Sequence, residues 1–407
     1  MSWAKRLHED SFEAIYLHIP FCIKKCAYCD FYSLATSHHA AVMQDYLNAL
    51  VADTHRAAAA GLLEHCRYAY IGGGTPSMLG DGLVQLVSEL RQSCPELCEL
   101  TSEANPESLS APLVSKLKEA GLTRLSVGVQ SCNDNELNAL GRIHDVACAE
   151  LRVKEAVAAG LDVSCDLMCA IPLQTAQSWK DSLDKLISWG PTHISVYPLQ
   201  IEEGTELAYR VGDQNPAWND SDVQAERMSY AADKLSSVGF ERYEVASFAK
   251  NHKFCQHNLS YWQGRSYLGL GKGAAGMMTA ELYGRMRKQG YAFPQLEDSF
   301  KRIRTKLTGD KLELEFLTES QACAEDLMLS ARLVEGISAD QLDYAQSVLG
   351  KALLERQIEQ LIKQGLLQSK GQRVVPTHRA WLLGNELFEM LWSLTPEFET
   401  KTLEVSL

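Results

Sequence analysis

The chain has 407 residues, of which 46% are hydrophobic, and its formal net charge is -13. This length exceeds a usual single core, so we expect one large domain with a smaller one. The acidic balance disfavours a general nucleic-acid surface, which needs a basic footprint. The sequence has no run of about 18 apolar residues, which disfavours a membrane span, and its charged first ten residues lack an apolar signal core, which indicates a cytoplasmic protein.

Strand-like and helix-like segments alternate in six units from residue 13 to about residue 200. Six alternating units predict parallel strands with outer helices, arranged as an open sheet or as a partial barrel. Glycine follows four of the helical segments, as helix C-termini favour. The predicted strands are 14–19, 68–71, 97–103, 125–129, 163–168 and 194–199, and the predicted helices are 42–60, 83–91, 112–120, 147–159 and 176–189.

Three cysteines, Cys22, Cys26 and Cys29, lie within eight residues directly after the first predicted strand. A structural zinc site takes four protein ligands, and an iron–sulfur cluster held only by protein takes four cysteines. With three local cysteines, a four-iron cluster would leave one iron free to bind a chelating molecule. The alternative, three ordinary buried cysteines, is disfavoured because reduced cysteines rarely cluster in a loop without a metal. We interpret most of the other nine cysteines as small core residues.

Polar residues follow the later predicted strands. A run of three glycines, residues 72–74, comes after the second strand, where bare backbone can approach a ligand closely. Glu103, Gln130 and Asp166 end the next three strands, and Arg142 follows the fourth. A buried charge without a partner is costly. Two interpretations stay open: ligand contacts, or internal ion pairs of Arg142 with Asp166 or Glu103.

The segment His257-Asn258-x-x-Tyr261-Trp262 stands out beyond residue 200. A lone histidine is more often a hydrogen-bonded core residue than a ligand. Imidazole is nevertheless a good ligand for heme iron, and tyrosine and tryptophan offer flat apolar faces to a porphyrin.

A basic run interrupts the acidic balance further along the chain. It consists of Lys301, Arg302, Arg304 and Lys306. Short charge runs are common on surfaces, so we interpret this one as a solvated segment, with docking of an anion or a partner as the alternative. From about residue 316 the pattern is helical until a short hairpin-like stretch, with a last helix from Arg379.

The Cys-x3-Cys-x2-Cys spacing, the Gly-Gly-Gly-Thr-Pro run and the His-Asn-x-x-Tyr-Trp motif together resemble the radical S-adenosylmethionine (radical SAM) superfamily. Within it, the chain is similar to the coproporphyrinogen dehydrogenase-like group, which includes heme chaperones. The resemblance extends from residue 16 to about residue 394. It implies a partial (β/α)6 TIM-like barrel, with its chemistry at the C-terminal ends of the strands, followed by a mostly helical, winged-helix-like C-terminal domain. We expect a barrel over 1–240, an extension with the His257 segment over 241–310, and the helical domain over 311–407.

The resemblance also implies cofactors and their residues. Cys22, Cys26 and Cys29 would hold a 4Fe–4S cluster that binds SAM at its open iron. Our first hypothesis is that the reduced cluster can cleave the SAM sulfonium bond to a 5'-deoxyadenosyl radical. The residues that fall where the family's SAM-contacting residues fall are Tyr16, Tyr28, Gly73, Gly74, Thr75, Glu103, Gln130, Arg142 and Asp166, and those that fall in its proposed heme motif are His257, Tyr261 and Trp262.

Two functions compete under this resemblance. Oxygen-independent coproporphyrinogen III dehydrogenases carry a further cysteine two residues after the third, where this chain has Phe31, and a longer segment before the cluster. We therefore favour a protein that binds heme and transfers it to acceptor proteins, respiratory ones among the candidates, over that oxidoreductase. A radical SAM methyltransferase or heme-degrading relative is a third, less favoured option. An electron donor is a further expected partner, nucleic acid is not expected, and peripheral contact with a membrane stays open.

The sequence departs from the family pattern at three places. Ala170 and Leu173 stand where the family usually has glycines, in the loop after the fifth strand, and Cys132 replaces a usual phenylalanine. The departures affect the shape expected for that loop.

Overall fold

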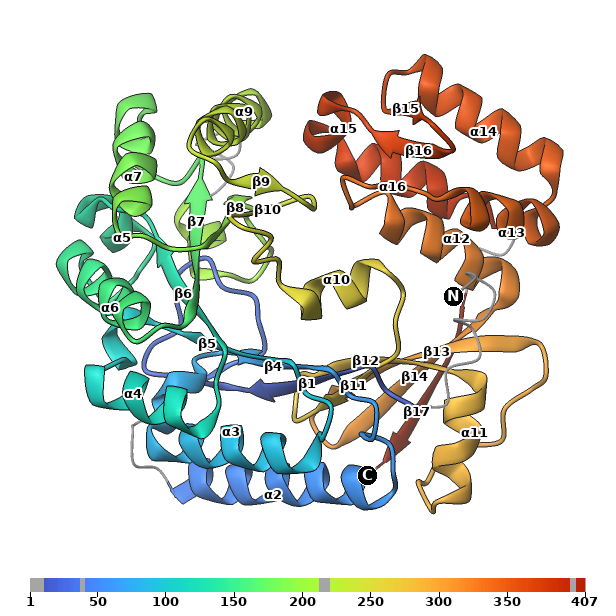
Figure 1. The fold of residues 1–407 in the computed structure, drawn as a ribbon, viewed down its shortest axis with the longest axis horizontal. Helices are drawn as coiled ribbons and strands as arrows, with labels where there is room; N and C mark the ends of the chain where they lie inside the picture. Colours follow the sequence, from blue (N-terminus) through green and yellow to red (C-terminus); the bar gives the residue numbers. More distant parts are fainter. Residues whose placement is uncertain (1–10, 37–40, 212–219, 396–399, 407) are drawn as a thin grey trace.

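The computed structural model describes residues 11–36, 41–211, 220–395 and 400–406 (Figure 1). Its centre is a parallel sheet in which six strands lie side by side in chain order. The predicted alternation of strands and helices is therefore confirmed. The six strands are β1 (Ala14–Ile19), β4 (Tyr68–Gly73), β5 (Glu99–Ala104), β6 (Arg124–Gln130), β7 (Asp162–Cys169) and β8 (His193–Pro198).

Helices cover the outer side of this sheet (Figure 1). Their apolar residues recur at helical spacing, as Leu83, Leu86, Val87 and Leu90 do along one buried face. The strands are buried on both faces, as parallel strands usually are, so that all but the last residue of β6 is buried. These helices are α2 (Ala41–Ala59), α3 (Asp81–Ser93), α4 (Ala111–Ala120), α5 (Asp134–Ala139), α6 (Val146–Ala158) and α7 (Ala176–Ser188).

The sheet does not close into a full barrel, because further strands extend both of its edges. On one edge, β11 (Tyr267–Leu270) pairs in parallel with β1 and starts an antiparallel extension. On the other, β10 (Ser247–Ala249) pairs with β8. The remaining strands of the sheet are β9 (Glu241–Arg242), β12 (Ala275–Thr279), β13 (Phe300–Thr308), β14 (Lys311–Thr318) and β17 (Lys401–Ser406), and the helices of this part are α8 (Glu206–Val211), α9 (Ser221–Ser237), α10 (Gln256–Trp262) and α11 (Ala280–Lys288).

The C-terminal part has its own core, which includes Leu327, Ile337, Leu361 and Leu391. Its helices and a short hairpin fit the expected winged-helix-like pattern. The limits proposed for the three parts stay a prediction; β14 and β17, at the two ends of 311–407, pair with each other in the main sheet. The elements are α12 (Glu319–Ser330), α13 (Ala339–Leu349), α14 (Lys351–Lys363), β15 (Leu367–Lys370), β16 (Arg373–Pro376), α15 (His378–Leu382) and α16 (Gly384–Trp392).

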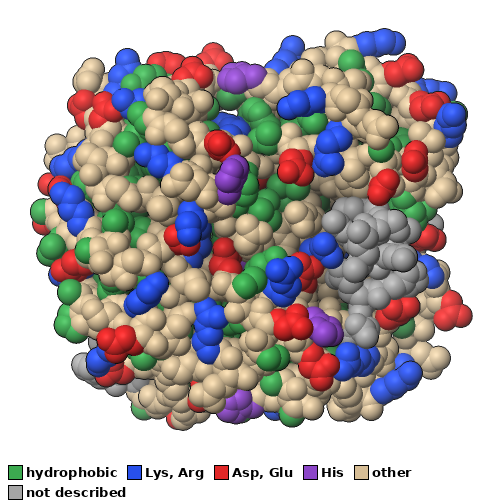
Figure 2. Space-filling model, in the orientation of Figure 1, with side chains coloured by type: hydrophobic (Ala, Val, Ile, Leu, Met, Phe, Trp, Pro, Cys, Tyr) green, Lys and Arg blue, Asp and Glu red, His purple; other side chains and the backbone are tan. Residues whose placement is uncertain are grey.

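The interpretation of the basic run as a solvated segment is wrong for its two arginines. Arg302 is 4% exposed, and its guanidinium lies 2.7 Å from carboxylate oxygens of both Glu325 and Asp326. Arg304 lies 2.9 Å from Glu325. The run forms part of β13, where residues two apart share a face, so both arginines reach the C-terminal helix α12. On the face seen in Figure 2, by contrast, charged side chains of both signs are interspersed.

The loop after β7 keeps a backbone that usually requires glycine. Ala170 has φ 55° and Leu173 has φ 66°, both in the left-handed region. A side chain in this region costs on the order of 1 kcal/mol or more, which glycine avoids. The two departures from the family pattern therefore leave the backbone in a glycine-like conformation, at a cost in local strain.

None of the helices in the described ranges is long and apolar enough to cross a membrane.

Candidate functional site

The cysteine loop is closed at its base by a short strand pair. After β1, β2 (Phe21–Cys22) pairs with β3 (Leu34–Ala35), and the backbone N–H of Leu34 donates to the carbonyl of Pro20 at 2.6 Å. The loop between them turns Cys22, Cys26 and Cys29 towards one cavity of about 150 Å³. The bare backbone of Gly73 and Gly74, at the end of β4, forms another wall. The sulfurs and the glycine backbone therefore meet at the C-terminal edge of the parallel strands.

A hydrogen-bond chain links two of the sulfurs from behind. The Thr75 hydroxyl donates to Cys22 Sγ at 3.5 Å and accepts from Asn105 Nδ2 at 2.9 Å. Arg142 donates to Asn105 Oδ1 at 2.7 Å and to Cys26 Sγ at 3.4 Å. Donors directed at sulfur favour the thiolate, which is the form that binds metals. The chain of bonds holds Cys22 and Cys26 on one side of the cavity.

These residues fit an iron–sulfur cluster better than a single ion. Within the described residues, no group of three His, Cys, Asp or Glu side chains is arranged to hold one metal ion. A cluster makes a different demand, because each cysteine ligates a different iron around a shared volume. Burial raises the pKa of the Cys22 and Cys29 thiols, so ionisation there depends on a positive group such as a bound metal. The three thiols around one cavity meet the demand of a cluster.

Two partly buried carboxyl groups face the same cavity. Glu103 accepts from the Tyr70 hydroxyl at 2.9 Å and from the Gly73 backbone N–H at 3.0 Å, and burial raises its pKa to about 7. Burial raises the pKa of Asp166 to about 6. Among the described residues neither carboxyl forms an ion pair with Arg142, so the ion-pair alternative is wrong. Two carboxyl groups without a cationic partner suit a ligand that brings an amine or hydroxyls.

Most residues expected to contact SAM converge here. Gln130 has φ 67° at an irregularity in the pairing of β6 with β7, a strained backbone of the kind that gathers at functional sites. Tyr16 lines a second cavity, described below, that adjoins the first, and the hydroxyl of Thr75 contacts Cys22 from behind. Their roles as SAM contacts stay a prediction. Those that line the cysteine cavity are Tyr28, Gly73, Gly74, Glu103, Gln130, Arg142 and Asp166.

A second cavity of about 810 Å³, the ring chamber, adjoins the first, and Lys25, Phe31 and Glu103 line both. Nearly half of the residues in its walls carry rings. The sequence interpretation missed most of these rings, because they come from separate segments that only the fold brings together. The rings of the chamber are Tyr16, His18, Phe31, Tyr32, Tyr70, Tyr197, His257, Tyr261 and Tyr267.

The helix α10 places His257 in the wall of the ring chamber. Its side chain is fully buried, and its Nε2 lies 2.6 Å from the Tyr261 hydroxyl. Its ring centroid lies 5.1 Å from that of Tyr70. Burial lowers the pKa of His257 to about 3, so the imidazole is neutral around pH 7. Trp262, which follows Tyr261 in the sequence, lines a different hollow. The structure therefore brings together two of the three residues expected to contact heme.

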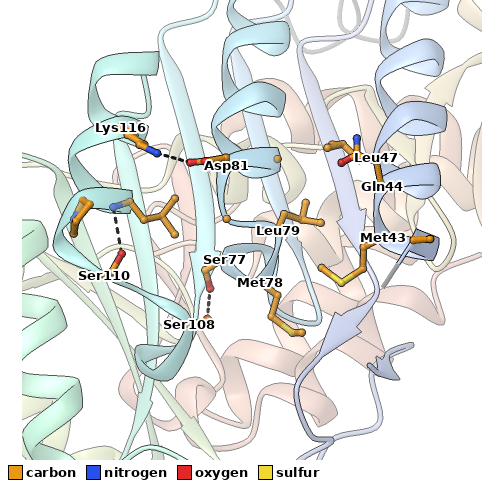
Figure 3. A pocket seen from close by; sticks show the side chains of 15 residues that line it. Met43, Gln44, Leu47, Ser77, Met78, Leu79, Asp81, Ser108, Ser110 and Lys116 are labelled. Carbon is orange, nitrogen blue, oxygen red and sulfur yellow. Dashed lines mark hydrogen bonds and ion pairs between the residues drawn. The ribbon is translucent and has the colours of Figure 1, made fainter. Parts of the chain in front are cut away.

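An outer hollow of about 830 Å³ lies apart from these cavities, where α2, α3 and α4 begin (Figure 3). It shares no lining residue with the cysteine cavity. Its polar side chains bond to one another: Lys116 to Asp81 at 2.7 Å, and Ser77 to Ser108 at 2.5 Å. We assign it no role in the chemistry of the cysteines.

Comparison with known proteins gives the family. A model of the Radical SAM superfamily matches residues 16–186, and a model of the HemN C-terminal domain matches residues 317–383. The heme chaperone HemW of Mycobacterium tuberculosis is 33% identical over 93% of this chain and 94% of its own length. The chain belongs to the HemW family.

Other HemW proteins match over similar lengths. Those of Haemophilus influenzae and Bacillus subtilis are 33% and 31% identical over 93% and 92% of this chain, and over 97% and 98% of their own lengths. Among solved structures, coproporphyrinogen III oxidase (HemN) from Escherichia coli has a TM-score of 0.72 at 17% identity, covering 97% of this chain and 93% of HemN. HemN and the HemW family therefore share this fold. Membership of the radical SAM superfamily implies a 4Fe–4S cluster and SAM as cofactors.

Asn105 is the main residue of the HemW-family cysteine site that the sequence interpretation did not select. It bridges Thr75 and Arg142 behind the sulfurs. The signal was present, because Asn105 comes directly after a strand end at the same edge as Glu103. A polar residue at that edge is a candidate even when its side chain is short and uncharged.

Gly74 gives a first prediction. An added Cβ would lie 2.7 Å from the carbonyl oxygen of Phe21 and 3.0 Å from Cys22 Sγ. Gly74→Ala should push the cysteine loop out of place, and displacements of about 1 Å can cost on the order of 100-fold in function. We expect iron and sulfide content after anaerobic reconstitution to fall well below half of wild type. Gly284→Ala is the control, because its Cβ meets open space in α11. Equal iron in both variants would contradict this account of the loop.

Proposed function

We propose that this HemW-family protein binds heme and passes it to acceptor proteins, with a 4Fe–4S cluster and SAM held in the cysteine cavity. The observation that carries the proposal is the similarity to proteins named heme chaperone HemW along 93% of the chain, C-terminal part included. The ring chamber supports it, because a flat apolar ligand needs flat apolar walls. We place this activity in the cytoplasm, with an electron donor and the heme acceptors as partners.

In this proposal the cysteine cavity prepares the cofactors. Cys22, Cys26 and Cys29 hold the cluster, which when reduced supplies one-electron chemistry to the sulfonium of bound SAM. The chain orients SAM through the Gly73 and Gly74 backbone. Glu103, whose pKa is raised to about 7, can hold or release a proton near neutral pH beside that ligand.

The ring chamber is the proposed heme site. Tyr70, His257 and Tyr261 offer ring faces, and Lys25 and Lys306 line the chamber, where they can pair with propionates. A neutral imidazole has a lone pair for heme iron. To ligate through Nε2, His257 must exchange its bond to the Tyr261 hydroxyl for one to iron.

The alternative is an oxygen-independent coproporphyrinogen III dehydrogenase. The fold shared with HemN agrees with this alternative in architecture, but a shared fold does not establish a shared reaction. The position two residues after Cys29 is Phe31, not the further cysteine of those enzymes. We therefore retain heme handling as the proposal.

Removal of the His257 side chain tests the heme site. We expect His257→Gln to weaken heme binding by about tenfold, or about 1.4 kcal/mol, and to shift the Soret band, because glutamine keeps a polar group near Tyr261 but is a poor iron ligand. The measurement is an anaerobic heme titration followed by absorbance. His55→Gln is the control, since His55 is exposed on α2. A variant that keeps the thermal stability, heme affinity and spectrum of wild type would refute His257 as a ligand.

A further inference from the structure

The helix α10 presents the motif residues to two different spaces. His257 and Tyr261 are four residues apart, bond to each other and line the ring chamber. Trp262 lines another hollow, while Asn258, four residues before it, lines both. Residues four apart lie on one helix face, so the motif forms two faces rather than one site.

This second hollow, which we call the junction hollow, has a volume of about 670 Å³. Its lining residues come from β8 and α9 at the barrel edge, from α10, and from the C-terminal helices α15 and α16, whose positions Figure 1 shows. Tyr197 and Asn258 line both this hollow and the ring chamber, so the two spaces share part of one wall. The junction hollow therefore borders the proposed heme site on the side of the C-terminal domain.

Aromatic rings flank the junction hollow. Trp262 comes from α10, whereas Trp381 and Phe388 come from α15 and α16. Indole and phenyl faces bind flat conjugated molecules by stacking. The rings stand on opposite sides of the junction between barrel and C-terminal domain, so a planar ligand there would contact both.

Two cations lie against these rings, and the Arg242 guanidinium lies 5.2 Å from the centroid of the Trp381 ring. The Arg332 guanidinium lies 4.0 Å from the centroid of the Phe388 ring and 5.1 Å from that of Trp262. Among the described residues, it forms no ion pair or hydrogen bond, and its Nε is buried without a partner. Unmet donors on a partly buried guanidinium are costly, which indicates a site for an anionic oxygen ligand.

Glu244 lines the same hollow, and its carboxylate partly offsets the effect of burial on the pKa of Arg332, but the two side chains form no ion pair among the described residues. Glu244 is 2% exposed and accepts from the Ala246 backbone N–H at 3.2 Å. Burial raises the pKa of Glu244 and lowers that of Arg332. Both pKa shifts are in the direction expected for buried charges that no opposite charge fully compensates. The hollow thus combines ring faces with donors that a carboxylate can satisfy.

We infer that the junction hollow is a second tetrapyrrole subsite, in which a propionate pairs with Arg332 and the macrocycle lies against Trp262 and Trp381. The inference rests on the proposed heme function and extends it to a second place beside the ring chamber. A charge-assisted bond to a guanidinium combined with ring stacking recognises a flat dicarboxylate rather than an apolar molecule of any shape. It gives the C-terminal domain a direct part in holding the cargo.

Metal-free protoporphyrin IX distinguishes binding at this subsite from binding that depends on a side chain ligating heme iron. It takes no axial ligand, so its binding depends on stacking and carboxylates alone. We expect the unmodified protein to quench its own tryptophan emission on binding protoporphyrin IX, and to bind the dimethyl ester at least about tenfold more weakly, because the ester cannot pair with Arg332. Equal affinity for acid and ester would overturn the inference, as would binding of heme with no binding of protoporphyrin IX.

Two variants test the residues themselves. Arg332→Met and Trp381→Leu should each weaken protoporphyrin IX binding by about tenfold. Arg332→Met should also reduce the preference for acid over ester, to the part that Lys25 and Lys306 of the ring chamber contribute. Trp392→Leu is the control on α16, because Trp392 does not line the hollow. Since Trp381 is only partly buried, its variant remains informative if Arg332→Met does not fold. Affinities equal to wild type in the folded variants would overturn the inference.

The failures can be told apart. If the unmodified protein binds neither heme nor protoporphyrin IX, the proposed function itself fails. If it binds heme and the junction-hollow variants leave both affinities unchanged, the second subsite alone fails.

Discussion

Cys26→Ser should remove the iron–sulfur cluster while leaving the fold intact. Cys26 is partly exposed in the loop, so exchange of sulfur for oxygen leaves no buried cavity. Two cysteines cannot hold a cluster that needs three, and the Arg142 donor that contacts Cys26 Sγ would instead meet a hydroxyl, a poor ligand for iron. We expect iron and acid-labile sulfide to fall to background, and the electron paramagnetic resonance signal of the reduced protein to vanish.

Cys98→Ser is the matched control. Cys98 is an exposed free cysteine away from the cavity, so the variant should keep wild-type iron. Wild-type iron in Cys26→Ser, or background iron in both variants and in the unmodified protein, would contradict a cluster on this loop. Melting temperatures of both variants close to wild type would establish that the loss is local.

Arg302→Met should destabilise the protein by about 3–5 kcal/mol, because it removes the cation that two buried carboxyls share and leaves Glu325 with Arg304 alone of its two arginines. Glu325 is 4% exposed and Asp326 is 3% exposed, and both lie 2.7 Å from the Arg302 guanidinium. The pair joins β13 of the main sheet to α12 of the C-terminal part. The expected result is a lower midpoint of urea unfolding, measured by circular dichroism.

Lys301→Met, one residue away, provides the comparison. Lys301 is exposed, and within the described part of the chain its ammonium bonds only to the carbonyl of Asp298, so its loss should change the unfolding free energy by no more than about 0.5 kcal/mol. Equal effects of the two substitutions would show that the buried ion pair does not hold the two parts together.

The sequence predicted the core well because its signals are local. Apolar runs and helical periods placed the fifth helix of the repeated units at 176–189, and the structure has α7 at Ala176–Ser188. The strand ends then determined the site. Parallel strands bring their C-terminal ends to one edge, so Glu103, Gln130 and Asp166 could be expected beside the cysteines before any contact was known.

What could not be predicted depends on contacts between distant segments. The charge run gave no sign that Arg302 faces inward, because its partners Glu325 and Asp326 come from a later helix. The return of β17 to pair with β14 depends on register and not on composition. The division of the heme motif between two cavities follows from where the C-terminal helices pack against α10, which the four-residue spacing alone does not specify.

The most direct test of the account is an anaerobic comparison of heme binding and coproporphyrinogen III conversion by the unmodified, cluster-loaded protein. Heme would be titrated by absorbance, and protoporphyrinogen IX would be measured with SAM and a reductant present. The account predicts saturable heme binding, close to two hemes per chain if the junction hollow and the ring chamber both fill, and no protoporphyrinogen IX. Sustained formation of protoporphyrinogen IX with no heme binding would contradict it.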